Sequence, residues 1–290
     1  MTVWNLGSIN ADLVYRVPHL PLPGETLAAR EMQKGLGGKG ANMSVAAARA
    51  AARVVHLGAV GSDGRWMVER LLEYGVDTRS IREVGEASGH AVIAVDDSGE
   101  NAILLFPGAN RAIEIDALEM ALGAARGGDW FLTQNETNAQ AAAMRIARDK
   151  GLRCAYAAAP FDAEAVQAVL PMLDLLVLNA VEAEQLEAAT GQGVETLGVS
   201  DVVVTLGGDG CRWFHGSDAT DIPAIPVTPV DTTGAGDTFT GYLIAGLDRG
   251  LPMRQALGLA MQAGALMVTR SGTADVIPDL KDIEDARLGG

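Results

Sequence analysis

The chain has 290 residues, 48% of them hydrophobic, and a formal net charge of −15 at pH 7. This composition excludes intrinsic disorder and predicts a globular protein with a large core. The acidic balance argues against nucleic acid or an anionic membrane as a partner, because both require a basic patch. The two cysteines form no CxxC pair, and there is neither a basic leader nor an apolar run of about 18 residues. We therefore expect a cytoplasmic protein.

The first third of the chain mixes short strands with helices. Residues 3–6 form a predicted strand, and residues 11–35 carry three prolines without a helical period. A glycine-rich entry precedes a predicted alanine-rich helix at 41–54, which is followed by a strand at 54–60 and a helix at 65–73. Two β-rich runs at 90–95 and 101–106 flank an Asp/Ser/Gly turn and predict a hairpin. We group residues of about 11–35 and 88–108 as a small β-sheet lid.

Helical and extended patterns alternate from about residue 112 onward. This alternation predicts βαβ units and a largely parallel sheet between helix layers, in a single α/β domain over residues 1–290. The predicted helices are 139–150, 163–170 and 182–189, and the predicted strands are 153–157, 175–178 and 202–206.

The stretch DTTGAGDTFTGYLIAGL places Gly234, Ala235 and Gly236 directly before Asp237 at the start of an apolar helix. The N–H groups of a helix N-terminus bind anions such as a phosphoryl group. If Asp237 faces the attacking hydroxyl, it can act as a general base, and the positive helix end favours its ionised form. The alternative is an ordinary helix N-cap.

Two polar groups suit a polyol ligand. The glycines before Lys39 allow close approach to a backbone, and Asn42 offers both a donor and an acceptor to a sugar hydroxyl. Asn10 and Asp12 follow the first strand, at the end of a strand where α/β folds bind ligands. The alternatives are a solvated Lys39 and an Asx turn at Asn10. No GxGxxG follows this strand, which disfavours a dinucleotide-binding oxidoreductase.

Two further motifs fit a nucleotide and its metal. Glu182 can hold Mg²⁺ directly or through water, although Asn179 and Glu182 also match a helix capping box. The turn from Thr205 to Gly210 has room for a nucleotide, and a plain β-turn explains it equally well. The four histidines show no metal-ligand spacing and are interpreted as structural.

Together these motifs resemble the ribokinase-like (PfkB) family of sugar kinases over nearly the whole chain. The resemblance rests on GLGGKGANMSVAAARAAA and DTTGAGDTFTGYLIAGL, with LGSINAD and GENAILLFPGAN in support. It implies a doubly wound α/β domain and a β lid that often mediates homodimerisation. It also implies phosphorylation of a primary hydroxyl that depends on ATP and Mg²⁺.

The resemblance also implies roles for individual residues. Asp237 resembles the catalytic base, beside an anion hole of Gly234, Ala235 and Gly236. The implied sugar-binding positions are Asn10, Asp12, Gly38, Lys39, Asn42 and Glu136. The implied nucleotide positions are Asn179, Thr205, Gly207 and Gly210, and Glu182 is linked to Mg²⁺. Asp231 and Thr233 lie near an implied monovalent-cation site, for which K⁺ is the candidate.

The chain departs from the family pattern in two places. Ala157, Ala158, Ala159 and Pro160 stand where Asn-Pro-Ala-Pro is common, and residues 190–201 are too few for a helix usually found there. The second departure puts ATP affinity in doubt. Ribose is the expected substrate, because several hydrogen-bonding side chains converge. Fructose, another ketose or 2-keto-3-deoxygluconate is the alternative. A nucleoside is disfavoured by the 4% aromatic content, and a catalytically silent sensor is the non-enzyme alternative.

Overall fold

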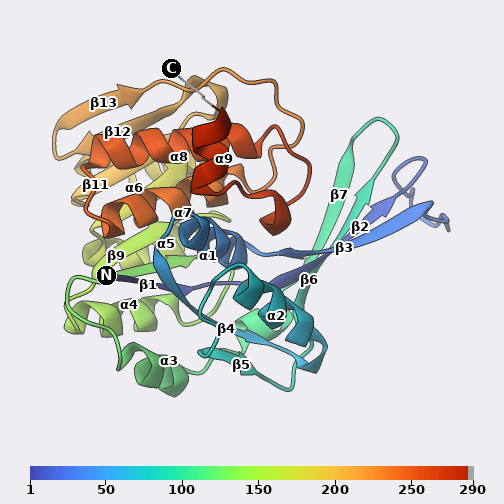
Figure 1. The fold of residues 1–290 in the computed structure, drawn as a ribbon, viewed down its shortest axis with the longest axis horizontal. Helices are drawn as coiled ribbons and strands as arrows, with labels where there is room; N and C mark the ends of the chain where they lie inside the picture. Colours follow the sequence, from blue (N-terminus) through green and yellow to red (C-terminus); the bar gives the residue numbers. More distant parts are fainter. Residues whose placement is uncertain (287–290) are drawn as a thin grey trace.

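The structure is a computed structural model and describes residues 1–286. A nine-stranded sheet forms the body of the molecule, and a four-stranded sheet projects from it as an arm (Figure 1). The large sheet has the order β13-β12-β11-β10-β9-β8-β1-β4-β5. Its strands are parallel from β5 to β11, whereas β12 and β13 are antiparallel at one edge. The prediction of an α/β fold with a mostly parallel sheet is confirmed.

The large sheet contains β1 (Thr2–Leu6), β4 (Arg53–Val60), β5 (Ile81–Glu83), β8 (Trp130–Gln134), β9 (Arg153–Ala157), β10 (Leu175–Asn179), β11 (Asp201–Thr205), β12 (Cys211–His215) and β13 (Asp218–Ile222). The small sheet contains β2 (Asn10–Arg16), β3 (Glu31–Gly37), β6 (Gly89–Val95) and β7 (Asn101–Phe106). The helices are α1 (Lys39–Arg49), α2 (Arg65–Glu73), α3 (Ile115–Leu122), α4 (Gln140–Asp149), α5 (Ala163–Val169), α6 (Ala180–Thr190), α7 (Ala235–Asp248), α8 (Met253–Met267) and α9 (Leu280–Ala286).

An apolar core lies on each face of the large sheet. Helices α1, α2, α7, α8 and α9 pack on one face, and α3 to α6 pack on the other. The chain starts in the middle of the sheet with β1, extends it through β4 and β5, and then builds the other side from β8 onward. The fold is therefore doubly wound, with its switch point at the carboxyl end of β1, where such sheets bind ligands. No helix among residues 1–286 is long and apolar enough to span a bilayer.

The small sheet has the order β3-β2-β6-β7. The predicted hairpin is present as the antiparallel pair β6 and β7, and β2 joins it in parallel through β6. β2 follows β1 after three residues, and β3 ends one residue before α1 begins. The base of the arm is therefore anchored beside the carboxyl end of β1.

The predicted helix at 41–54 is too long. It ends at Arg49, and Ala51 takes a left-handed conformation with φ of 65°. The N–H of Ala52 then donates to the carbonyl of Ala47, which closes a Schellman-type turn before β4. Glycine is the usual residue at such a stop, and an alanine there gives no sequence signal of a helix end.

Between the end of α6 at Thr190 and the start of β11 at Asp201 there is no further α-helix, as predicted, and only a short 3₁₀ turn at Val194–Thr196. Helix α6 begins two residues earlier than predicted because Asn179 caps it. The antiparallel hairpin of β12 and β13 was not expected from the alternating pattern.

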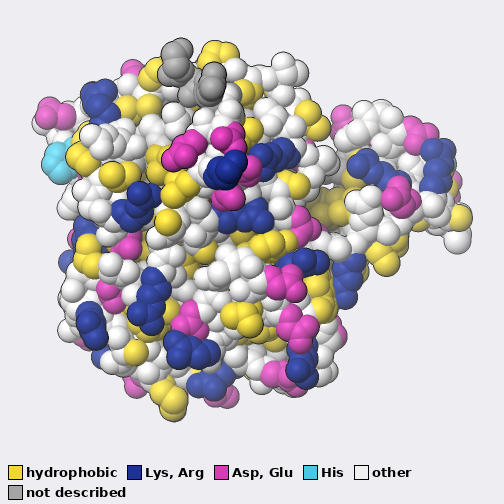
Figure 2. Space-filling model, viewed as in Figure 1, with side chains coloured by type: hydrophobic (Ala, Val, Ile, Leu, Met, Phe, Trp, Pro, Cys, Tyr) yellow, Lys and Arg dark blue, Asp and Glu magenta, His cyan; other side chains and the backbone are white. Residues whose placement is uncertain are grey.

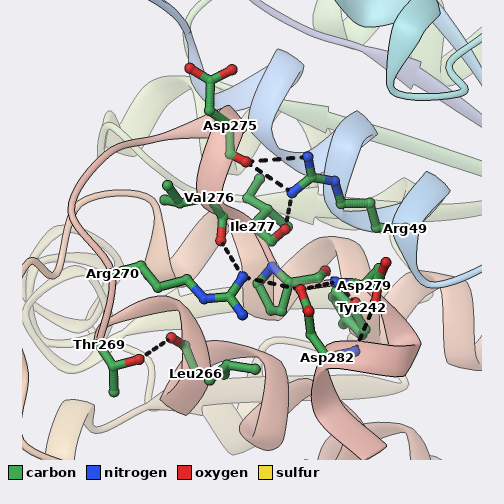
Figure 3. A network of polar contacts seen from close by, with 11 residues as sticks. Arg49, Tyr242, Leu266, Thr269, Arg270, Asp275, Val276, Ile277, Asp279 and Asp282 are labelled. Carbon is green, nitrogen blue, oxygen red and sulfur yellow. Dashed lines mark hydrogen bonds and ion pairs between the residues drawn. The ribbon is translucent and has the colours of Figure 1, made fainter. Parts of the chain in front are cut away.

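The segment that leads into α9 has little regular structure and is fixed by side chains of the surrounding helices (Figure 3). The guanidinium of Arg49 donates to the carbonyl oxygens of Asp275 and Ile277. The hydroxyl of Tyr242 donates to the carbonyl of Pro278 at 2.6 Å. Arg270 donates to the carbonyl of Val276 and to the carboxylate of Asp282, both at 3.1 Å. These contacts hold the segment against α1, α7 and the turn that follows α8.

Candidate active site

Helices α1 and α7 bring the two glycine-containing signatures together. A Cβ on Gly241 of α7 would lie 2.5 Å from the Cβ of Ala46 in α1, so glycine permits this close packing. The first turns of both helices consequently face each other at the carboxyl end of β1. There the amide of Asn42 donates a hydrogen bond of 2.9 Å to the carboxylate of Asp237.

Asp237 is buried in the first turn of α7, and Gly234, with φ of 73°, is the N-cap. The alternative of an N-cap role for Asp237 is therefore wrong. Burial raises the pKa of the Asp237 carboxyl, although the charge of Lys39 and the Asn42 hydrogen bond act in the opposite direction. The helix end is expected to favour the ionised form, but the net pKa shift is upward because desolvation outweighs the favourable contacts with Lys39 and Asn42.

Lys39, the first residue of α1, is partly buried and faces carboxylates. Its pKa is raised, mainly by the charge of Asp237 and further by Glu136 and Glu182, while burial acts against the shift. The alternative of a freely solvated Lys39 is therefore wrong. Four predicted site residues from different parts of the chain form one electrostatic cluster.

Glu136 follows β8 and is held by the first turn of α1. Its Oε2 accepts a hydrogen bond of 3.1 Å from the backbone N–H of Lys39 and another from the hydroxyl of Ser8. The N–H of Gly40 in turn donates to Ser8 Oγ at 3.2 Å. Ser8 was missed by the sequence analysis, where its place within LGSINAD was the available signal.

Asn10 opens β2 and is buried. Its Oδ1 accepts a hydrogen bond of 2.7 Å from Asn110, whose own Oδ1 accepts from the N–H of Ile9 at 2.9 Å. A side chain 100 residues away therefore fixes Asn10, in place of the local Asx turn considered above. Asn110 was not predicted, although it ends the quoted stretch GENAILLFPGAN.

Asp12 lies on β2 against the backbone of Gly37, where a Cβ would overlap its carboxylate. Burial raises the pKa of Asp12 to about 6, and the charge of Glu136 adds to the effect. A hydrogen bond with Thr273 acts in the opposite direction. The Thr273 hydroxyl lies 2.8 Å from the carbonyl of Leu36, so its single hydrogen is shared between that carbonyl and Asp12. Thr273, a residue the sequence analysis missed, therefore links the C-terminal segment to the sugar side of the site.

A cavity of about 310 Å³ opens beside the first turn of α7. Most of its wall is apolar, with Phe239 and Val268 among the lining side chains. Five residues predicted to contact nucleotide or phosphoryl groups line this single cavity: Thr205, Gly207, Gly210, Ala235 and Gly236.

Asn179 and Glu182 form the capping box that was considered as an alternative. The Asn179 side chain accepts from the N–H of Glu182 at 2.9 Å, and the Glu182 carboxylate accepts from the N–H of Asn179 at 2.8 Å. Asn179 is not among the residues that line the cavity. The charge of Glu182 nevertheless contributes to the raised pKa values of Lys39 and Asp237, so its carboxylate lies within electrostatic range of the site.

Asp231 joins two loops beside α7. Its carboxylate accepts from the N–H of Thr233 at 2.9 Å and from the N–H of Gly272 at 3.3 Å. Within residues 1–286 no group of three or more His, Cys, Asp or Glu side chains is arranged to hold a metal ion.

Known proteins match the chain over nearly its full length. The model of the pfkB family of carbohydrate kinases matches residues 2–280. Ribokinase from Haemophilus influenzae is 34% identical in an alignment of 292 positions, which covers 96% of this chain and 95% of the relative. The ribokinase structure from Thermotoga maritima has a TM-score of 0.88 at 30% identity and covers 98% of both chains. Arabidopsis thaliana ribokinase, complexed with ribose and ATP, has a TM-score of 0.85 at 29% identity and covers 98% of this chain and 97% of that one.

The match agrees with the geometry, because the two signatures meet at the hydrogen bond between Asn42 and Asp237 and the cavity reaches the same turn of α7. The chain therefore belongs to the pfkB family of carbohydrate kinases, phosphotransferases that act on a sugar hydroxyl.

Proposed function

We propose that this protein is an ATP-dependent ribokinase, which transfers the γ-phosphoryl group to a primary hydroxyl of ribose. The hydrogen bond between Asn42 and Asp237 carries the proposal, because it places a sugar-binding amide beside a buried carboxylate. The cavity reaches the same turn of α7 through Ala235 and Gly236. The Arabidopsis relative, solved with ribose and ATP, supports the same pair of ligands.

Asp237 is the proposed general base. Its raised pKa makes the carboxylate a stronger proton acceptor, while Lys39 and Asn42 favour the ionised form that must accept the proton. The sugar oxygen bonds to the γ-phosphorus, its proton passes to Asp237, and the bond to the leaving ADP oxygen breaks. The first-turn N–H groups of Gly234, Ala235 and Gly236 are proposed to stabilise the charge on the transferring group.

The sugar side offers acceptors that need donors. Asn42 Oδ1 is buried and has no hydrogen-bond partner within residues 1–286, which is costly unless a ligand hydroxyl satisfies it. Carboxylates next to it can accept from other hydroxyls of a polyol. The proposed contacts are Asn10, Asp12, Gly38, Lys39, Asn42 and Glu136.

A ketose remains the alternative substrate, because the same acceptors suit its hydroxyls. A sugar acid such as 2-keto-3-deoxygluconate is less favoured. Its carboxylate would need a cation, and Lys39 already faces Asp237, Glu136 and Glu182. A nucleoside is also less favoured, since Phe106 of the small sheet already stacks on His90, with ring centroids 5.1 Å apart.

The nucleotide side supports ATP with Mg²⁺. An apolar cavity suits the adenine ring, and Glu182, whose charge acts on Asp237, is the proposed residue linked to the metal. Glu182 would hold Mg²⁺ with few other protein ligands, and the bound ion would neutralise part of the phosphate charge. The loop around Asp231 and Thr233 is proposed to hold K⁺. Asn179 is proposed to contact the nucleotide.

The small sheet is proposed as a lid and as a homodimer interface. Its edge strand β7 exposes four consecutive apolar side chains: Ile103, Leu104, Leu105 and Phe106. An exposed apolar run on an unpaired edge strand is unfavourable in a monomer. In Figure 2 the arm stands apart from the body and is open to a second copy on the side shown.

The test is ATP-to-ADP turnover with Mg²⁺ and K⁺ across ribose, fructose, 2-keto-3-deoxygluconate and adenosine. We expect ribose to give the highest kcat/KM. If fructose gives the highest kcat/KM, the proposed substrate becomes a ketose and the assignment of ribose is wrong. Sugar binding without any turnover, measured by calorimetry with the same panel, would support the silent sensor instead.

A further inference from the structure

A buried polar network lies beneath the sugar side of the site. It consists of Asn5 in β1, Ser44 in α1, His56 in β4 and Gln134 in β8, each with at most 1% of its surface exposed. None of the four is among the proposed substrate contacts. Because buried polar groups are costly unless hydrogen-bonded, their joint placement at this point requires an explanation.

The hydrogen atoms of this network can be assigned in one consistent way. His56 Nε2 lies 3.1 Å from the carbonyl of Gly7, which can only accept, so Nε2 carries the proton. Burial lowers the pKa of His56 to about 4, so the ring is neutral and Nδ1 is an acceptor. The hydroxyl of Ser44 therefore donates to Nδ1, at 2.8 Å.

The remaining hydrogen bonds run in the same donor-to-acceptor direction. Ser44 Oγ accepts from the amide of Asn5 at 2.8 Å, and the Oδ1 of Asn5 accepts from Gln134, also at 2.8 Å. The Asn5 amide donates a second bond of 2.8 Å to the carbonyl of Gly40. No donor faces a donor anywhere in this chain of bonds.

Both ends of the network hold the backbone of site segments. His56 holds Gly7 and Asn5 holds Gly40, and these two glycines cross in direct backbone contact, so that a Cβ on either would overlap the other. The segment after Gly7 carries Ser8 and Asn10, and the helix around Gly40 carries Lys39 and Asn42. The distance between the two proposed sets of sugar contacts is therefore set at this crossing.

We propose that His56 is a positioning residue for sugar binding, whose single neutral tautomer fixes the crossing of the Gly7 loop with the start of α1. It touches no substrate and acts through Gly7 and, by way of Ser44 and Asn5, through Gly40. The inference rests on the proposed function as a sugar kinase. If His56 had only a general structural role, its replacement would lower the stability of the fold alone. If it is a positioning residue, its replacement lowers the affinity for sugar more than the affinity for ATP.

The test compares His56→Phe, which keeps a ring and removes both nitrogens, with His56→Gln, which can retain a donor toward Gly7. Val55→Ala is the matched control, because Val55 is the neighbouring buried residue on the opposite face of β4. We expect His56→Phe to raise the KM for ribose at least about tenfold with a KM for ATP within about twofold of wild type. His56→Gln should recover part of the loss, and Val55→Ala should leave both KM values unchanged.

Hydrogen exchange provides a readout that does not depend on activity. We expect faster amide exchange in residues 7–12 and 38–44 of His56→Phe than in Val55→Ala. If exchange is faster in His56→Phe while the wild type shows no sugar-dependent turnover, the proposed kinase function fails. The role of His56 in holding the crossing of Gly7 and Gly40 would still stand. An active wild type whose His56→Phe variant keeps the wild-type KM for ribose would overturn the positioning role.

Ser44→Ala keeps the proposal testable if His56→Phe does not fold. It removes the donor to Nδ1 and the acceptor for Asn5, so it should raise the KM for ribose in the same direction. When Ser44→Ala is combined with His56→Gln, the rise in the KM for ribose should be less than additive, because both changes break the same network of hydrogen bonds. Fully additive effects would contradict a connected network.

Discussion

Asn42 and Asp237 are 195 residues apart in sequence, and a hydrogen bond of 2.9 Å joins their side chains. Each belongs to one of the two sequence signatures, and each lies in the first turn of its helix. The bond exists because α1 and α7 pack closely at Gly241. It connects the residues proposed for sugar binding with the residue proposed for proton transfer.

Removal of the carboxylate tests the general base directly. Asp237→Asn should lower kcat by at least about 100-fold and leave sugar binding largely intact, because the amide cannot accept the hydroxyl proton. Steady-state turnover and calorimetric sugar binding give the two values. Asp248→Asn is the control, since Asp248 is also a buried carboxylate of α7. Near-normal turnover in Asp237→Asn would exclude this residue as the base.

The hydrogen bond to Asn42 should shape the pH dependence. It lowers the pKa of Asp237, so Asn42→Ala should raise that pKa further and move the acidic limb of the kcat profile to higher pH. The measurement is kcat against pH at saturating sugar. Asn138→Ala is the control, because Asn138 makes comparable amide bonds to Ile113 away from Asp237. An unmoved acidic limb would show that Asp237 does not set it.

Ionised Asp12 should lower the free energy of unfolding at neutral pH. Its pKa rises from 3.8 to about 6 on folding, so the unfolded chain loses this proton first and stability falls as pH rises from about 4 to 6. Asp12→Asn should remove that fall and stabilise the protein by on the order of 2 kcal/mol at pH 7, while weakening sugar binding.

Thermal unfolding of Asp12→Asn from pH 4 to 7 measures this effect. Asp97→Asn is the control, because Asp97 lies in the turn between β6 and β7 of the same small sheet, exposed and paired with Arg30. It should change Tm little. A lower Tm for Asp12→Asn at pH 7 would contradict the assigned pKa direction.

Close packing of α1 and α7 should not tolerate a methyl group. Gly241→Ala would place a Cβ 2.5 Å from Ala46, so we expect a loss of about 1–3 kcal/mol in the free energy of unfolding, together with reduced turnover. Denaturant unfolding gives the first quantity. Gly258→Ala in α8 meets no atom within 4 Å and should be neutral or stabilising by up to about 1 kcal/mol. Equal behaviour of the two variants would refute the steric explanation.

The exposed strand β7 should govern assembly. Leu104→Lys places a charge on a side chain that is 71% exposed in one copy, and we expect it to shift a dimer to monomers. Sedimentation velocity across a concentration series measures the change. Met120→Lys on α3, at 72% exposure, is the matched control and should leave assembly unchanged. A wild-type protein that is monomeric at all concentrations would remove the dimer proposal.

Much of the architecture was predictable because its signals are local. The hairpin of β6 and β7 was found within one residue, and α2 at its observed bounds, from periodicity and turn residues. Both signatures were visible because glycines before a helix mark backbone that can approach a ligand. The stop of α1 escaped prediction, because Ala51 adopts a left-handed conformation that its residue type does not announce.

The sequence by itself determined the fold class, the two signatures and the residue types of the candidate site. Only the tertiary structure decided how they are held: Asn110 behind Asn10, Thr273 beside Asp12, and His56 beneath the crossing at Gly7. It also decided the direction of the Asp237 pKa shift, where burial outweighs the contacts with Lys39 and Asn42. The physical reason is that these contacts and the loss of water arise between segments far apart in the chain, and no local pattern records them.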